Sequence, residues 1–275
     1  ATNSAGKSFA RRTSDSERWE RWVSTRSIFT ALAVALVATL GGCAHPGSGL
    51  PVGSFERGIA EYGGERYLDS IETLRLFIRR NPTDPRVDEA QYHIGLARFD
   101  AEEYAVAAVE FEILRSDYPN SDLVEDSWMM EGRCYLEQLP SIHHEQSVTR
   151  RALAHYQRYL REYPDGEFSA EARERVDDLL LHLDRKRMAA VRLYARLGRD
   201  RAALVSVEAL LDERPDSQLR PEALLIAGDL HEELGEFEQA RTRWRQLLDE
   251  HGTDELAPRA QERLERTRRE VGEAR

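Results

Sequence analysis

The chain is poor in cysteine, which excludes a disulfide framework. Its 275 residues contain two cysteines, Cys43 and Cys134, whereas small secreted folds held by disulfides contain several pairs. Glycine and proline are also sparse, at 17 and 10 residues, which leaves little room for turn-rich β structure. Apolar residues make up 41% of the chain, too many for a disordered protein. The composition therefore predicts a mostly helical, soluble body.

Basic residues are not in excess either. The formal net charge is −11, from 50 acidic residues against 39 Lys and Arg, and a protein that wraps a nucleic-acid backbone needs a clustered basic stripe. Nucleic acid is therefore not an expected partner. The sequence also lacks a nucleophile elbow, a phosphate loop, a dinucleotide fingerprint and a His-Glu-x-x-His pair. The cluster His143-His144-Glu145 is better explained as a solvated polar stretch, so we expect neither an enzyme nor a metal site.

The N-terminus has the pattern of a targeting segment. Basic residues precede an uncharged, apolar-rich run over residues 28–40, and a helix over that run reaches about 20 Å, short of the roughly 30 Å of a bilayer core. The run ends in Leu40-Gly-Gly-Cys43, which resembles the lipobox at which bacterial lipoprotein precursors are cut and lipidated. We therefore expect a signal peptide over 1–42, a covalent lipid on Cys43 as the only bound group, and a lipidated linker over 43–50. Ala44 rather than Asp follows the cysteine, which in such lipoproteins implies the periplasmic face of the outer membrane.

The rest of the chain repeats, with a period of 37 residues between Gly58, Gly95 and Gly132. A small residue recurs once per unit, a bulky apolar residue follows four positions later, and a helix breaker follows twelve positions after the small residue. This spacing is typical of tetratricopeptide repeats, in which two helices form each unit. The three columns are Ser70, Ala107, Ala152, Ala203 and Ala240; Leu74, Phe111, Tyr156, Val207 and Trp244; and Pro82, Pro119, Pro164, Pro215 and Gly252.

The repeat pattern predicts an all-α fold. We expect a tetratricopeptide-repeat superhelix of about five helix pairs over 51–252, followed by a solvated C-terminal helix over 253–275. Extra residues over about 139–149 predict an insertion between the two helices of the third unit. The segment 170–184 is predicted to form an additional or lengthened helix. In the fourth unit Val191 stands where the other units have a glycine.

Together these features resemble the BamD family of outer-membrane assembly lipoproteins. The resemblance spans roughly residues 40–255 and rests on the lipobox, the five repeats, the turns over 117–122 and 162–167, and the interruption after Pro140. It implies a lipid-anchored helical scaffold that docks on the periplasmic domains of BamA, the barrel-inserting protein, and receives unfolded outer-membrane proteins. Other Bam lipoproteins are further candidate partners, and the resemblance places the BamA contact in the C-terminal units, around 223–249.

The first helices of the first two units supply a candidate client-binding groove. Strands of outer-membrane barrels alternate apolar and polar residues, so an extended client can lay its apolar side chains into such a groove. The alternative is that these residues pack against the helices of the neighbouring unit, as apolar residues at helical spacing more often do. Replacing Tyr62 and Phe99 with Ser separates the two, because only a core role predicts unfolding. The candidate residues are Phe55, Ile59, Tyr62, Tyr92, Leu96 and Phe99.

Two other function classes stay open at this point. One is a periplasmic tetratricopeptide cell-envelope protein that couples to Tol–Pal and peptidoglycan synthesis, whose repeats carry similar Tyr-Pro-x-Ser turns. Such proteins usually have an N-terminal coiled coil and a soluble signal, and no heptad run precedes the first repeat here. The other is an envelope enzyme or its regulatory subunit, for which the sequence offers no support.

Overall fold

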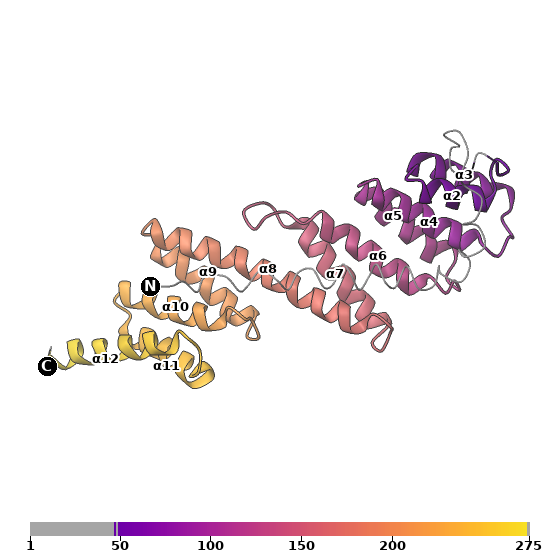
Figure 1. The fold of residues 1–275 in the computed structure, drawn as a ribbon. Coiled ribbons are helices and arrows are strands. Elements are labelled where there is room, and N and C mark those ends of the chain that lie inside the picture. Colours follow the sequence, from indigo (N-terminus) through magenta and orange to yellow (C-terminus); the bar gives the residue numbers. More distant parts are fainter. Residues whose placement is uncertain (1–46, 48, 274–275) are drawn as a thin grey trace, which may run out of the picture. The chain divides into compact units, whose positions relative to one another are not determined.

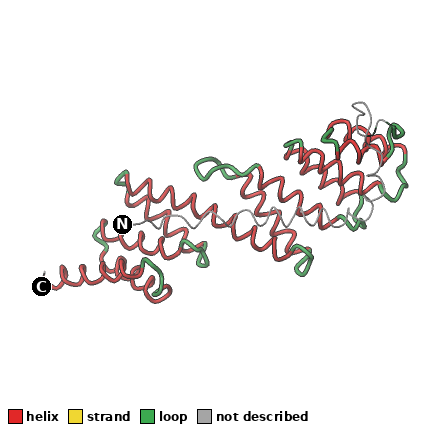
Figure 2. Tube along the Cα trace, in the orientation of Figure 1, coloured by secondary structure: helices red, strands yellow, loops and turns green. Residues whose placement is uncertain are grey.

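Helices are the regular elements of the chain wherever its structure is described. The computed structural model describes Gly47 and residues 49–273, which lie in one unit of the chain, Pro46–Arg275. Eleven helices follow one another in that part (Figure 1), joined by turns and loops and with no strand among the same residues (Figure 2). The prediction of an all-α fold is confirmed.

The helices form five consecutive pairs and a last helix, and each helix packs against the next one in the sequence. The five pairs agree with the number of repeats that the sequence predicts. The pairs are α2 (Phe55–Gly63) with α3 (Tyr67–Arg80), α4 (Val87–Asp100) with α5 (Tyr104–Asp117), α6 (Val124–Glu137) with α7 (Ser147–Glu162), α8 (Ser169–Arg196) with α9 (Asp200–Glu213), and α10 (Arg220–Glu233) with α11 (Phe237–His251), before α12 (Ala257–Glu273).

A glycine on the first helix of a pair faces a bulky side chain on the second. A Cβ atom added at Gly95 would lie 2.6 Å from the ring of Phe111, and one at Gly228 would lie 2.2 Å from Trp244. Because both rings are fully buried, the absence of a side chain at the glycine is what lets the two helices approach. Gly58 with Leu74 and Gly132 with Tyr156 repeat the arrangement.

In the fourth pair, two medium-sized residues pack where the other pairs have a glycine against a bulky side chain. Val191 stands in the glycine column and Val207 in the bulky column, and both are fully buried in the C-terminal core. A larger residue on the first helix is thus matched by a smaller one on the second, which conserves the packed volume.

Four of the five turns inside the pairs have the same backbone. Glu65, Glu102, Gly198 and Gly235 each have a positive φ between 57° and 74°. The amide after each of them donates to a carbonyl five residues earlier, as Glu236 does to His231 at 2.8 Å, which is the Schellman arrangement that ends a helix. Glycine adopts this φ without strain, whereas the two glutamates do not.

The third and fourth pairs hold the extra residues. The connection between α6 and α7 covers 138–146, and α7 begins at Ser147, so the last residues of the insertion expected over 139–149 are helical. The extra residues over 170–184 belong to one unbroken helix, α8, and therefore lengthen a helix rather than add one. Figure 1 shows α8 as the long helix in the middle of the array.

The expected solvated helix over 253–275 needs correction. The last helix, α12, buries Ala257 and Ala260, and Leu264 packs against the C-terminal core. Arg263 also pairs with Asp229 on α10 at 3.1 Å. The last pair of a repeat array exposes an apolar edge that needs a cover, and the alanines of α12 supply one although the helix is otherwise strongly charged.

Candidate binding surfaces

Three of the six predicted groove residues come together around one histidine. The rings of Phe55 and Tyr62 on α2 lie 6.5 and 5.5 Å from the ring of His93 on α4, and that of Tyr92 lies 6.4 Å from it. The Tyr62 hydroxyl donates a hydrogen bond to the carboxylate of Asp100. These contacts join α2 to α4, so Phe55, Tyr62 and Tyr92 take part in packing between the first two pairs.

The other three predicted residues lie outside this cluster. The ring of Phe99 packs edge-on against Tyr104 at 5.2 Å, and the guanidinium of Arg133 lies over its face. Ile59 and Leu96 are half-buried and lie on the same two helices. All six predicted residues are half-buried, and the structure divides them into three that meet at His93 and three that do not.

His93 itself was not among the predicted site residues. Its Nδ1 is enclosed and has no hydrogen-bond partner among the described residues. Burial lowers the pKa of His93 from 6.5 to about 4, because the apolar surroundings disfavour the charged imidazolium. The only sequence signal was its place beside Tyr92 in an apolar stretch of helix, which does not distinguish it from other histidines.

A groove that the sequence did not predict lies in the C-terminal half of the array. Its volume is about 1210 Å³, and it runs between α8 and α10 with the α6–α7 loop at its side. Apolar lining comes from Ala189, Ala190 and Leu193 on α8 and from Ile226 and Leu230 on α10. Leu193 keeps 48% of its surface exposed, so the groove offers apolar area to a ligand.

The α6–α7 loop is held in place as a wall of this groove. Lys186 on α8 donates to the backbone carbonyls of Ile142 and His144, and the fully buried Gln146 donates to those of Ser141 and His144. Ile142 is one of the residues that line the groove. The insertion that the sequence predicts in the third repeat is therefore an ordered part of a surface built by the fourth and fifth pairs.

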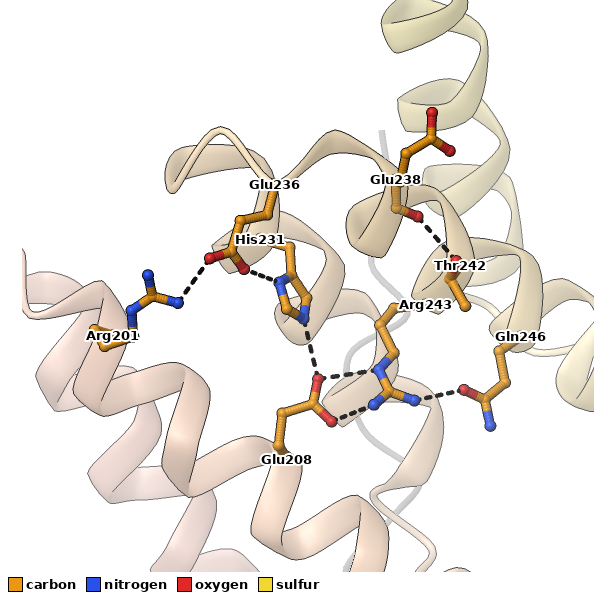
Figure 3. A network of polar contacts seen from close by, with 8 residues as sticks. All are labelled: Arg201, Glu208, His231, Glu236, Glu238, Thr242, Arg243 and Gln246. Atoms are coloured by element: carbon orange, nitrogen blue, oxygen red, sulfur yellow. Dashed lines mark hydrogen bonds and ion pairs between the residues drawn. The ribbon is translucent and has the colours of Figure 1, made fainter.

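A network of polar contacts fixes α10, the other wall, to its neighbours (Figure 3). Glu208 on α9 contacts Nε2 of His231 at 3.2 Å and accepts a hydrogen bond from Nε of Arg243 on α11 at 3.0 Å. Glu236, just before α11, contacts Nδ1 of His231 at 2.7 Å and pairs with Arg201. The network thus ties α9 and α11 to α10, which keeps the groove wall rigid.

The remaining predictions concern attachment and metal binding. Cys43, the signal peptide over 1–42 and most of the linker over 43–50 lie outside the described residues. Among the helices that are described, none combines the length and the apolar character needed to cross a membrane. His143 and His144 are exposed, and within the described ranges no three His, Cys, Asp or Glu side chains are grouped to hold a metal ion.

Comparison with known proteins identifies the family. A family model described as "outer membrane lipoprotein", YfiO, matches residues 51–247, which is well over half of the chain. The chain belongs to the YfiO family of outer membrane lipoproteins. This bears out the resemblance found in the sequence, and the matched region includes all five helix pairs, up to Leu247 in α11.

Two curated relatives of this YfiO-family chain bear the same name. It is 25% identical over 224 residues to the outer membrane protein assembly factor BamD of Caulobacter vibrioides, covering 78% of this chain and 73% of that one. It is 22% identical to the BamD of Pasteurella multocida, covering 62% of this chain and 66% of that one.

Solved structures, one of them described as a TPR protein, also align with this YfiO-family chain. A thermophilic protein of Thermus thermophilus shares 18% identity with a TM-score of 0.31, over 75% of this chain and 95% of its own. The protein MamA of AMB-1 gives the same identity and TM-score over 74% and 93%.

Proposed function

We propose that this chain is a lipid-anchored scaffold for the assembly of β-barrel proteins into the outer membrane. The observation that supports it most directly is the match of residues 51–247 to a family of outer membrane lipoproteins. Both curated relatives are named for outer membrane protein assembly. The anchor is a lipid on Cys43, which holds the helix pairs at the periplasmic face of the outer membrane.

The partners proposed for this scaffold are proteins of the assembly machinery. The periplasmic domains of a BamA-like insertase are the main partner, unfolded outer-membrane proteins are the clients, and other Bam lipoproteins are additional partners. A row of stacked helix pairs suits this role because each pair adds surface without closing the array into a globule. We propose a binding role rather than catalysis.

The client surface is proposed for the first two pairs. Phe55 and Tyr62 are engaged in packing, so contact with a client falls mainly to Ile59, Leu96 and Phe99. We expect Phe99→Ser to weaken binding of a client peptide while the far-UV circular dichroism spectrum is kept. The matched control is Phe77→Ser, at a buried ring in the core of the first two pairs, which should unfold these pairs instead. Unfolding by Phe99→Ser would assign Phe99 to the core.

Co-purification tests the proposed function in cells. The C-terminally tagged chain is extracted from membranes in mild detergent, and the proteins bound to wild type and to Cys43→Ser are identified by mass spectrometry. We expect a barrel protein with periplasmic domains to be bound to wild type and lost with Cys43→Ser. Cys134→Ser is the matched control, because this thiol is buried, has a pKa raised to about 12 by burial, and serves no anchor.

Another set of partners would overturn the proposal. Recovery of Tol–Pal or peptidoglycan-synthesis proteins in place of a barrel protein would assign the chain to the cell-envelope class of tetratricopeptide proteins. Full recovery of the barrel protein with Cys43→Ser would show that the lipid anchor is not needed for assembly.

A further inference from the structure

The groove between α8 and α10 has the size of a peptide site rather than of a metabolite site. Its volume of about 1210 Å³ exceeds the roughly 300–1,000 Å³ of most small-molecule pockets. Its apolar lining forms a strip, with Leu193 on one helix and Ile226 and Leu230 on the other. A strip between two helical walls fits one apolar face of an elongated segment.

The two walls carry opposite charges. Arg196 stands on the α8 wall and Glu233 on the α10 wall. Both are exposed, and neither has an ion-pair partner among the described residues, where the guanidinium of Arg196 reaches only the backbone carbonyl of Arg192 at 3.3 Å. Arg192 pairs with Glu222 at 2.5 Å and Asp229 with Arg263 at 3.1 Å. Lys186, also on the α8 wall, donates to the loop carbonyls of Ile142 and His144, and Asp200 lines the groove at the start of α9. Arg196 thus faces a ligand from the α8 wall as an unpaired positive group, and Glu233 faces it from the α10 wall as an unpaired negative one.

The last helix of the chain shows how a helix is seated beside α10. The small residue Ala260 of α12 enters the C-terminal core, while Arg263, on the flank of the same helix, pairs with Asp229 of α10 at 3.1 Å. An apolar stripe with a basic flank toward α10 is therefore a combination that α10 already accepts. Asp229 also lines the groove.

From the apolar strip, the opposed charges and this precedent we infer that the groove docks an amphipathic helix of a partner protein. The helix presents apolar residues at i, i+3, i+4 and i+7 to Leu193 and Ile226. It carries Asp or Glu on the flank that faces Arg196 and Lys or Arg on the flank that faces Glu233. This inference goes beyond the proposed function, because it defines the chemistry of the ligand without requiring that the ligand be an insertase or a client.

Three synthetic helical peptides with the same apolar face test the inference on the purified mature chain. One has an acidic and a basic flank, one has two acidic flanks, and one has two basic flanks, and binding is followed by fluorescence anisotropy. We expect the mixed peptide to bind about tenfold more tightly than either of the others, as expected when one charged contact is replaced by a repulsive one. Equal binding of all three, or binding of none, would overturn the inference.

Charge inversion of the walls makes the test specific for this groove. Arg196→Glu replaces the unpaired positive group opposite Glu233 by a negative one, so the peptide with two basic flanks should become the tightest ligand. The double variant Arg196→Glu/Glu233→Arg restores one wall of each sign and should restore the preference for the mixed peptide. Arg161→Glu on α7, an exposed arginine outside the groove, is the matched control and should change nothing. An unchanged preference in Arg196→Glu would place the peptide elsewhere.

A second variant tests the apolar strip without changing charge. Ala190→Trp fills the groove from α8 and should reduce binding of the mixed peptide by about tenfold or more, with an unchanged circular dichroism spectrum. Because Ala190 is partly exposed, the folded structure tolerates the larger ring. Undiminished binding to Ala190→Trp would contradict docking in the groove.

Discussion

The two halves of the array use the first helices of their pairs in different ways. On α2 and α4, aromatic rings meet around His93 and fill the space between the pairs. On α8 and α10, residues such as Ala189 and Ala190 leave a groove of about 1210 Å³, and the α6–α7 loop adds a wall. Beneath each surface one pair packs a glycine against a buried ring, Gly95 against Phe111 and Gly228 against Trp244. Whether a pair offers a groove therefore depends on the size of the side chains on its first helix, and not on the backbone repeat.

The largest expected effect tests the shared packing beneath the two surfaces. Gly95→Ala and Gly228→Ala should each lower the free energy of unfolding by about 3 kcal/mol, because the new methyl group collides with a buried ring that has no room to move. Urea denaturation followed by circular dichroism measures the loss. The control is Gly63→Ala at the end of α2, where the added atom meets open space. A loss at one end of the array only would show that the two halves do not pack alike.

The next effect separates the filled surface from the open one. Phe55→Ala should cost about 2 kcal/mol of stability, since its ring contacts Phe77 and His93. Leu193→Ala should cost less than about 0.5 kcal/mol, because half of that side chain is exposed beside the groove. Thermal unfolding of the two variants makes the comparison. Similar losses would mean that the groove is part of the core.

The histidine beneath the filled surface predicts a pH dependence of stability. Burial lowers the pKa of His93 from 6.5 to about 4, so the unfolded chain binds the proton more tightly than the folded chain. Stability is then fully present above pH 6.5 and is lost as the pH falls toward about 4, by about 3 kcal/mol. Urea titrations at several pH values, compared between wild type and His93→Leu, measure the difference. A wild-type pH profile identical to that of His93→Leu would contradict the burial of a neutral imidazole.

The smallest effect concerns the turns, where the two halves also differ. Glu65 and Glu102 hold a positive φ in the first two pairs, whereas Gly198 and Gly235 hold it in the fourth and fifth. Glu65→Gly should therefore raise the free energy of unfolding by about 1 kcal/mol, and Gly235→Ala should lower it by about the same amount. Chemical denaturation of both variants tests the sign. Destabilisation by Glu65→Gly would mean that the side chain contributes more than the backbone strain costs.

Much of the fold could be predicted because the residues that recur in each repeat are the ones at which the two helices of a pair pack. A glycine on one helix and a large residue on the other mark each close approach, so the columns around Gly95 and Phe111 show where pairs form. The burial of α12 was missed because alanines on a charged helix form a stripe too weak to recognise without its neighbour. The sequence alone does not distinguish a lengthened α8 from an additional helix, since charged residues over 170–184 suit either one long helix or two short ones.

The binding surfaces were less predictable than the fold. Periodicity finds apolar residues on one face of a helix but does not say whether Tyr62 meets a neighbouring helix or a ligand. The C-terminal groove was missed for a different reason, because its walls come from segments far apart in the sequence. Ile142 in a loop, Arg196 on α8 and Glu233 on α10 become one surface only after the third, fourth and fifth pairs have stacked.

The most direct test of the central claim follows the folding of a barrel protein in cells depleted of this chain. Folded outer-membrane barrels migrate differently from unfolded ones in gels run without heating, so the folded fraction can be read at successive times after depletion. The proposed function predicts that unfolded barrel protein accumulates, that wild-type chain restores folding, and that Cys43→Ser does not. Normal barrel folding throughout depletion would contradict a role in outer-membrane protein assembly.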